Sequence, residues 1–123
     1  MGFLDKYASQ ILGVTRIVAA LIFLEHGTMK LLGFPPGMSP PVGSIFWIAG
    51  LIELAAGVLI ALGLFSRIAA FIASGEMAFA YFMGHFPKAF FPAQNGGDAA
   101  ILYCFLFLYL AAAGPGSFAL NRK

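Results

Sequence analysis

Five ionisable side chains lie in otherwise apolar stretches of this sequence, where a charge is costly: Glu25, His26, Lys30, Glu53 and Glu76. The first three share the stretch FLEHGTMKLLG. An ionisable group at the centre of a membrane helix costs ~2.5–3.5 kcal/mol on insertion scales. Each of these groups must therefore be paired, protonated or hydrated. Ionisable residues in such a setting are the first candidates for a ligand or proton site.

The composition indicates an integral membrane protein with a single domain, residues 1–123. Hydrophobic residues make up 61% of the 123 positions and charged residues only 10%, with a mean hydropathy of +0.92. A soluble domain averages about 45–50% apolar and about 25% charged residues. The net charge of +2, without a basic run, gives no indication of a nucleic-acid partner. The lone Cys104 excludes an internal disulfide and a dithiol redox couple.

Four apolar segments predict membrane helices, at about 11–32, 44–62, 66–83 and 99–113. Stretches rich in Gly and Pro separate them: the loop 33–43, the turn GLFS and the connection 84–98. The fourth segment is short for a span, which needs about 20 residues. We therefore expect an all-α fold, an integral membrane four-helix bundle.

The distribution of Lys and Arg predicts the orientation of this bundle. With four spans, one side of the membrane receives Lys6, Arg67, Arg122 and Lys123. The other side receives only Lys30 and Lys88. Because cytoplasmic loops carry an excess of Lys and Arg, both termini are expected in the cytoplasm.

A short internal repeat relates the first and third segments. TRIVAALIFLE aligns without gaps on SRIAAFIASGE. The alignment matches Arg16 with Arg67 and Glu25 with Glu76. Since these two helices run in the same direction, the match is compatible with a duplicated two-helix hairpin. So short a repeat leaves duplication and coincidence as equal alternatives.

The three glutamates are predicted to lie at nearly one depth. With a rise of ~1.5 Å per residue, Glu25 and Glu76 lie roughly 13–14 Å from the arginine near the start of their helices. Glu53 lies about 15 Å from the end of the second segment, which is a similar level. Small residues flank Glu53 and Glu76, so neighbouring helices can approach closely. We therefore expect an inward-facing ligand or proton site of these three glutamates, joined by His26 and Lys30.

Five further residues are candidate accessory groups of this site: Arg16, Arg67, Tyr81, His85 and Tyr103. The two arginines are expected mainly as interfacial anchors, with their heads at lipid phosphates. His85 is expected mainly as a hydrated interface histidine. Lys30 is expected equally as a snorkelling residue or as a partner of Glu25 or Glu53. The glutamates have a structural alternative too, in which they only join helices by hydrogen bonds.

No metal, haem or catalytic motif is predicted. Di-metal bundles use Glu-x-x-His, whereas His26 directly follows Glu25. The sequence contains no nucleotide-binding loop, nucleophile triad or CxxC pair. The chain alone is therefore not expected to be a complete enzyme, and its participation in a reaction as a subunit stays open.

Nearly the whole chain resembles the DoxX family of small four-helix bacterial and archaeal membrane proteins. The resemblance rests on an ordered series of motifs: Arg16, HGTMKL (26–31), GLIELAAGVLIALGLFSRIAA (50–70), Met77, His85, NGGDAAILY (95–103) and GPGSFALN (114–121). Two positions depart from the family pattern, since Asp98 stands where Glu is usual and Asn121 where Asp is common. Loss of the closing acid weakens any functional role for the tail.

The resemblance implies a multi-pass protein of the bacterial or archaeal cytoplasmic (inner) membrane, in contact with the lipid bilayer. Members are described as membrane subunits associated with redox systems, including a thiosulfate:quinone oxidoreductase and an oxidative-stress complex. We therefore expect a non-catalytic subunit that anchors a redox partner protein and holds a quinone-like or lipid-like molecule beside the carboxylates. The alternatives are a proton-coupled transporter of a small solute or lipid, and a structural membrane scaffold. A homo-oligomer is compatible with all three functions, because a four-helix bundle this small has little interior of its own.

Overall fold

The computed structural model describes residues 1–123 and contains helices but no strand, which confirms the all-α expectation. The long helices are α2 (Ala8–Leu32), α3 (Ile45–Leu62), α4 (Ser66–Ala80) and α6 (Asp98–Ala113). The short helical segments are α1 (Gly2–Asp5), the π-helical turn η1 (Tyr81–His85), the 3₁₀ turn η2 (Phe86–Lys88) and α5 (Pro92–Asn95). The long helices match the four predicted segments, although α2 begins three residues earlier and α4 gives way to η1 before residue 83.

Local sequence explains where α2 and α3 end. α2 stops at Gly33 (φ 71°) and α3 at Gly63 (φ 68°), a left-handed conformation that glycine adopts without strain. Ser44 caps the start of α3, because its Oγ accepts a hydrogen bond from the Trp47 backbone N–H at 3.3 Å. The prolines between the two helices lack the N–H that a helix requires, so this connection is irregular.

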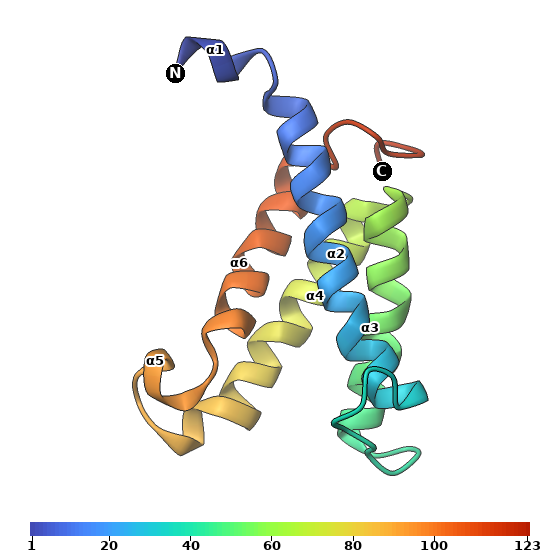
Figure 1. Ribbon diagram of the computed structural model, residues 1–123, viewed down its shortest axis with the longest axis vertical. Coiled ribbons are helices and arrows are strands. Elements are labelled where there is room, and N and C mark those ends of the chain that lie inside the picture. Colours follow the sequence, from blue (N-terminus) through green and yellow to red (C-terminus); the bar gives the residue numbers. More distant parts are fainter.

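The long helices associate as two consecutive pairs. α2 packs on α3, α4 packs on α6, and α3 links the pairs through its contact with α4. Figure 1 shows the pairs close together at the end that holds the C-terminal tail. They diverge toward the opposite end, which holds α5 and the loop between α2 and α3.

Glycines bring α2 and α3 into backbone contact. A Cβ atom at Gly27 would lie 2.6 Å from the Leu54 backbone nitrogen and 3.0 Å from the Gly50 carbonyl oxygen. A Cβ atom at Gly57 would lie 3.1 Å from the Leu24 Cβ. Membrane helices use small residues in this way, since close backbone approach maximises van der Waals contact where lipid supplies no hydrophobic driving force.

The core lies between the helix pairs and is built mainly from small side chains and aromatic rings. Phe23 on α2 and Phe107 on α6 are fully buried, with ring centroids 4.9 Å apart. Tyr103 stacks on Phe107 at 5.5 Å. The remaining buried apolar residues are Ala19, Ala20, Ala56, Ile60, Ala69, Ala70, Ala73, Met77, Tyr81, Ala100 and Leu110.

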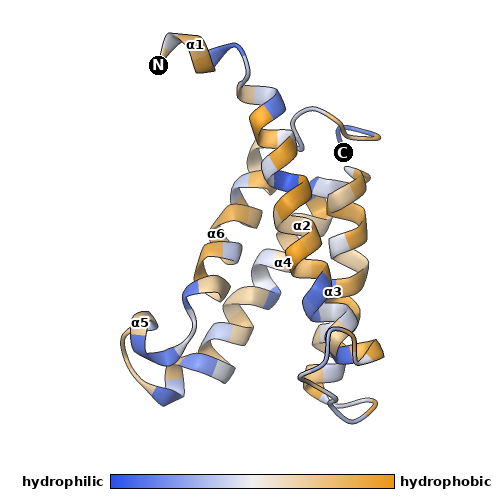
Figure 2. Ribbon diagram, viewed as in Figure 1, coloured by the Kyte–Doolittle hydropathy of each residue, from blue (hydrophilic) through white to orange (hydrophobic).

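The outer surface of the helices is apolar over most of its length (Figure 2). Large hydrophobic side chains such as Ile68, Phe71, Leu102 and Phe105 point outward and are exposed. α2 and α3 are each long and apolar enough to cross a membrane, and α6 is a shorter apolar helix. A contiguous apolar exterior of this extent is matched to lipid rather than to water.

Arg16 holds the C-terminal tail against the helix ends. Its side chain is fully buried, and its guanidinium donates hydrogen bonds to four carbonyl oxygens: Ile60, Pro115, Ser117 and Phe118. A planar group with five donors can satisfy several carbonyls at once, which makes its burial tolerable. The interpretation of Arg16 as an anchor with its head at lipid phosphates is therefore wrong.

Arg67 and Asn121 hold the same tail at the turn between α3 and α4. Arg67 is exposed and donates to the carbonyl oxygens of Ala111, Ala112 and Arg122. The Asn121 Oδ1 accepts a hydrogen bond from the Phe65 backbone N–H at 3.0 Å. An amide oxygen performs this capping as well as a carboxylate, so Asn121 has a structural role here.

Candidate functional site

A cavity of about 950 Å³ lies where the helix pairs diverge, between α2 and α3 on one side and α4 with η1 on the other. Its walls are largely apolar and include Ile48, Ile52, Ile72 and Phe79. Five ionisable side chains also line it: His26, Lys30, Glu76, His85 and Lys88. The cavity is thus open on one side, since Ile48, Ile72 and Phe79 are exposed, and it combines apolar walls with a small number of polar groups, as ligand sites usually do.

An ion pair between neighbouring helices closes one wall of this cavity. The Lys30 Nζ donates to both carboxylate oxygens of Glu53, each at 2.8 Å. The side chains are 13% and 1% exposed, respectively. Gly50 permits this approach, because a Cβ atom there would lie 2.8 Å from the Lys30 Cβ. Of the two roles predicted for Lys30, the structure supports the partner of Glu53.

Glu76 lies beside this ion pair, with its carboxyl group within hydrogen-bonding reach of the Glu53 carboxyl group. It lines the cavity, and the charges of both Glu53 and Lys30 act on its carboxyl group. Its Oε1 is enclosed without a hydrogen-bond partner. The structure thus places two carboxyl groups around one lysine, and only Glu53 is fully paired.

Glu25 lies apart from these groups. Its side chain is exposed and does not line the cavity. At 100° per residue, it is about 200° around α2 from Gly27, which faces α3. The structure therefore brings Glu53, Glu76 and Lys30 together and leaves Glu25 on the outside of the helix.

His26 lines the cavity on α2, one turn before Lys30. Its ring lies edge-on to Tyr103 of α6, with centroids 6.5 Å apart. Tyr103 does not line the cavity and packs instead against Phe23 and Phe107. Tyr103 therefore supports the position of His26 and has no direct access to the cavity.

A hydrogen-bonded group at the α5 end holds His85 at the cavity. The His85 Nδ1 donates to the Asn95 carbonyl oxygen at 3.2 Å, which fixes the orientation of the ring. The Asn95 Nδ2 donates to the Tyr81 hydroxyl and to the Ala89 carbonyl oxygen, each at 3.1 Å. The Asn95 Oδ1 accepts from the Gly97 backbone N–H at 2.8 Å. His85 is thus partly buried and fixed, and Tyr81 is buried among its supports.

Asn95 is the member of this group that the sequence analysis did not single out. Its side chain bonds to the backbone two residues later, which is the habit of Asn in tight turns. The Asn-Gly-Gly run predicts such a turn. The contact with Tyr81 crosses the connection between α4 and α6, so sequence spacing does not reveal it.

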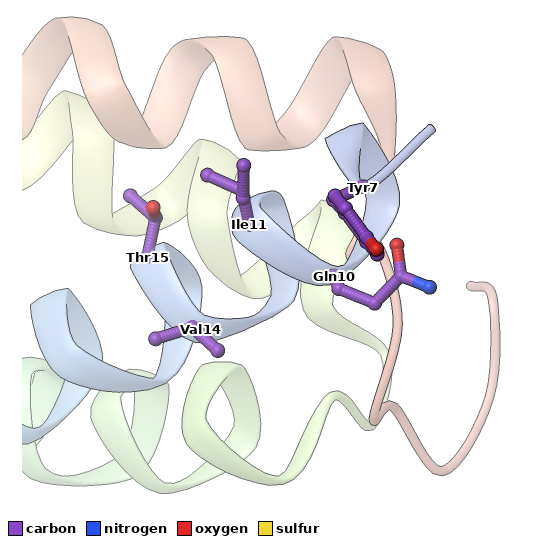
Figure 3. A pocket seen from close by; sticks show the side chains of 5 residues that line it. All are labelled: Tyr7, Gln10, Ile11, Val14 and Thr15. Carbon is purple, nitrogen blue, oxygen red and sulfur yellow. The ribbon is translucent and has the colours of Figure 1, made fainter. Parts of the chain in front are cut away.

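Neither a metal-binding cluster nor the second hollow of the molecule offers an alternative ligand site. No group of three or more His, Cys, Asp or Glu side chains lies close enough together to hold a metal ion. A second hollow, of about 370 Å³, lies on the first turns of α2 (Figure 3). It is lined only by Tyr7, Gln10, Ile11, Val14 and Thr15, which provide neither a carboxylate nor an imidazole.

Comparison with known proteins places these features in a family context. The model of a family described as DoxX matches residues 11–86. This segment contains Lys30, Glu53, Glu76 and His85. An uncharacterized protein of Haemophilus influenzae (strain Rd) is 45% identical over 130 residues, which cover 100% of this chain and 97% of that protein. No solved structure matches the chain.

Proposed function

Since this chain belongs to the DoxX family, we propose that it is a multi-pass protein of the cytoplasmic membrane, with α2, α3, α4 and α6 forming a four-helix bundle. The apolar exterior of these helices supports this arrangement. Both termini lie at the same end of the molecule (Figure 1), where Arg67 bonds to the C-terminal tail, and the positive-inside rule assigns this end to the cytoplasm. The α5 end then faces the opposite side.

Within that membrane, the protein is a non-catalytic subunit that anchors a redox partner and holds a quinone-like or lipid-like molecule. The observation that carries this function is the cavity of about 950 Å³ beside the Lys30–Glu53 ion pair. Ligand sites in proteins have volumes of about 300–1,000 Å³. The cavity is thus large enough for the head of such a molecule and part of its tail.

The lining of the cavity fits a quinone. Ile52, Ile72 and Phe79 provide apolar walls for a ring or an isoprenoid chain. His26 and Lys30 provide hydrogen-bond donors for a quinone carbonyl. A bound quinone would supply the two-electron chemistry that the side chains of this protein lack.

Extraction of the purified protein tests this function. The protein is purified in lipid nanodiscs and extracted with organic solvent, and apolar ligands are identified by mass spectrometry against empty nanodiscs. Ala49→Trp fills the cavity, since Ala49 lines it. Ala55→Trp is the matched control, because Ala55 lies on the same helix but is exposed outside the cavity. We expect a ligand that Ala49→Trp removes and Ala55→Trp retains; a ligand absent from the wild type, or unaffected by Ala49→Trp, contradicts the proposal.

Proton-coupled transport is a second candidate, favoured by the position of Glu76 next to an already paired Glu53. Two neighbouring carboxyl groups that share one lysine disfavour double ionisation, so Glu76 can take up and release a proton at the cavity. Proteoliposome flux of protons or small solutes that Glu53→Gln and Glu76→Gln leave unchanged excludes this candidate. A purely structural role predicts that Glu53→Gln lowers thermal stability without changing ligand retention.

A further inference from the structure

We infer that the outward face of α2 is an interface with a second copy of this chain, where two α2 helices pack in parallel around Glu25. Six residues form this face, which we call the outer seam: Ile11, Val14, Val18, Leu21, Glu25 and Thr28. None of them lines the cavity. Self-association through α2 is therefore separate from the proposed function, and either can fail without the other.

The outer seam follows a seven-residue repeat, because its members alternate steps of three and four residues. Such residues occupy the a and d positions of a heptad, which keep one face of a helix toward a parallel partner. Ile11 and Val18 are β-branched at position a, and Leu21 is at position d, a combination that favours two strands. Glu25 is also at position a, where a single polar residue fixes the register of a pair. Most membrane helix bundles cross at the same angle as coiled coils.

The fold of one chain leaves this seam uncovered. Its aliphatic members are 48–52% exposed, and the Glu25 side chain is exposed as well. The contacts of α2 with the rest of the chain use the opposite side of the helix. Ala20 and Gly27, for example, are buried and lie two residues after an a position, which is about 200° around the helix.

A hollow at the start of the seam has room for a side chain of a partner helix. This hollow of about 370 Å³ is lined by Tyr7, Gln10, Ile11, Val14 and Thr15 (Figure 3). In the heptad these residues take positions d, g, a, d and e, which are the positions that face a partner. An a or d side chain of the second α2 helix can insert between them, as a knob inserts into a hole.

Glu25 favours a protein partner over lipid at the seam. Its neighbours Leu21 and Ile22 are apolar and exposed, so a monomer presents the carboxyl group to hydrocarbon. Ionisable residues of membrane helices almost always face protein or water, because exposure to hydrocarbon is costly. Two copies with the same orientation, related by a two-fold axis along the membrane normal, place their Glu25 side chains at one level. A protonated carboxyl group can then donate to the carboxylate of its partner, so donor and charge are complementary.

The outward faces of α4 and α6 differ from the seam in composition. They carry large exposed rings, such as Phe71 and Phe105, whereas the seam contains no aromatic residue. The β-branched side chains of the seam lose little freedom when they pack, because their χ1 angle is already restricted. The seam is therefore better suited than those faces to close contact with another helix.

Disulfide cross-linking of single cysteines tests the interface. The full chain carries Cys104→Ala, which removes its only native cysteine. Val18→Cys and Leu21→Cys place thiols on the seam. Leu108→Cys is the matched control, because Leu108 is exposed on α6 and, like Leu21, lies about 15–17 Å along its helix from the α5 end of the molecule.

The purified variants are reconstituted in liposomes and oxidised with copper phenanthroline, and covalent dimer is measured on non-reducing gels. We expect at least about 5-fold more dimer from each seam position than from Leu108→Cys. Parallel a and d residues bring their Cα atoms within the range of about 4.4–6.8 Å that a disulfide spans. Absence of dimer at both seam positions, or an equal yield from Leu108→Cys, overturns the interface.

Variants of Glu25 test the role of the acid. Energy transfer between copies labelled at the N-terminus, measured as the protein is diluted in lipid, gives the dissociation constant. Glu25→Val removes the polar group and is expected to weaken association about 3- to 20-fold, the range for a hydrogen bond between membrane helices. Glu25→Gln keeps a donor and an acceptor and is expected to retain most of the affinity. Wild-type affinity in Glu25→Val overturns the role of Glu25.

The unmodified chain provides a test that needs no variant to fold. Energy transfer at high protein density that falls on dilution supports association of two copies. A wild-type protein that is monomeric throughout the dilution range overturns the inference and leaves the seam to a different protein. The ligand extraction of the proposed function is unaffected by that result, because the seam lies outside the cavity.

Discussion

The Nζ of Lys30 donates to both carboxylate oxygens of Glu53 at 2.8 Å, and this bidentate contact joins α2 to α3 at the edge of the cavity. Both partners are largely enclosed. In such surroundings, attraction between the charges is offset by loss of hydration, so the intact pair adds little net stability. Removal of either partner leaves the other as a buried, unpaired charge, which is strongly destabilising. The pair therefore specifies the register of α2 on α3 and the shape of the polar wall.

Lys30→Met is expected to lower the free energy of unfolding by about 3–5 kcal/mol, because it leaves Glu53 charged and unpaired. The double variant Lys30→Met/Glu53→Met is expected to recover most of this loss, since it removes both charges. Unfolding by SDS in mixed micelles, followed by circular dichroism, measures both. A double variant as unstable as the single one contradicts the prediction.

Gly27→Ala is expected to destabilise the protein by about 1–3 kcal/mol, which is the usual cost of overpacking. The added methyl carbon would lie 2.6 Å from a backbone nitrogen of α3, which has no side-chain freedom to move away. Gly75→Ala is the matched control on α4, because its methyl carbon meets nothing within 4 Å. Relief of glycine's backbone entropy makes this control about 0.5–1 kcal/mol more stable. Equal unfolding midpoints for the two variants in the same micelle assay contradict the prediction.

The four long helices are predictable from sequence because each contains an apolar run, and α2, α3 and α6 end at a glycine. Gly33 and Gly63 adopt the left-handed conformation that ends a helix, and both lie where the apolar runs stop. The end of the third run is less well defined. Apolar residues continue past Ala80, but the backbone changes there to a π-helical turn, and hydropathy does not distinguish the two.

The three glutamates are predicted to lie at one depth, but depth along a helix does not determine which way a side chain points. Counting residues gives the level of a side chain in the membrane but says little about the direction in which it points. Around Glu53, Gly50 and Gly57 are buried, and such small residues mark a face that contacts another helix. Around Glu25, Leu21 and Ile22 are large and exposed. The sizes of these neighbouring residues therefore distinguish Glu53, which faces another helix, from Glu25, which faces outward.

The internal repeat is reflected in the two arginines rather than in the two acids. Arg16 of α2 donates to the Ile60 carbonyl oxygen in the last turn of α3. Arg67 of α4 donates to the Ala111 and Ala112 carbonyl oxygens in the last turn of α6. Each arginine thus caps the second helix of its own pair. The burial of Arg16 depends on the tail, which lies about 100 residues away in sequence and is invisible to local patterns.

Arg16→Gln is expected to release the C-terminal tail. The variant loses most of the donors to Ile60, Ser117 and Phe118, and hydrogen bonds to a charged group contribute about 1.5–3 kcal/mol each. Backbone amides of residues 117–121 should then exchange with deuterium faster, by 10-fold or more. Arg67→Gln is the control, with a smaller effect because exposed interactions are weak. Unchanged exchange in Arg16→Gln contradicts the assigned role of Arg16.

Asn95→Ala is expected to loosen the α5 end of the cavity and to weaken ligand retention without unfolding the helices. The change removes three side-chain hydrogen bonds and leaves the buried Tyr81 hydroxyl without its Asn95 partner, at a cost of about 1–3 kcal/mol. Hydrogen exchange should quicken at the Gly97 amide, whose acceptor is lost. Since the turn also positions the carbonyl oxygen that holds His85, ligand retained in nanodiscs should fall. Gln94→Ala is the matched control one residue away, because Gln94 is exposed. Equal retention by the two variants would show that this end of the cavity has no part in binding.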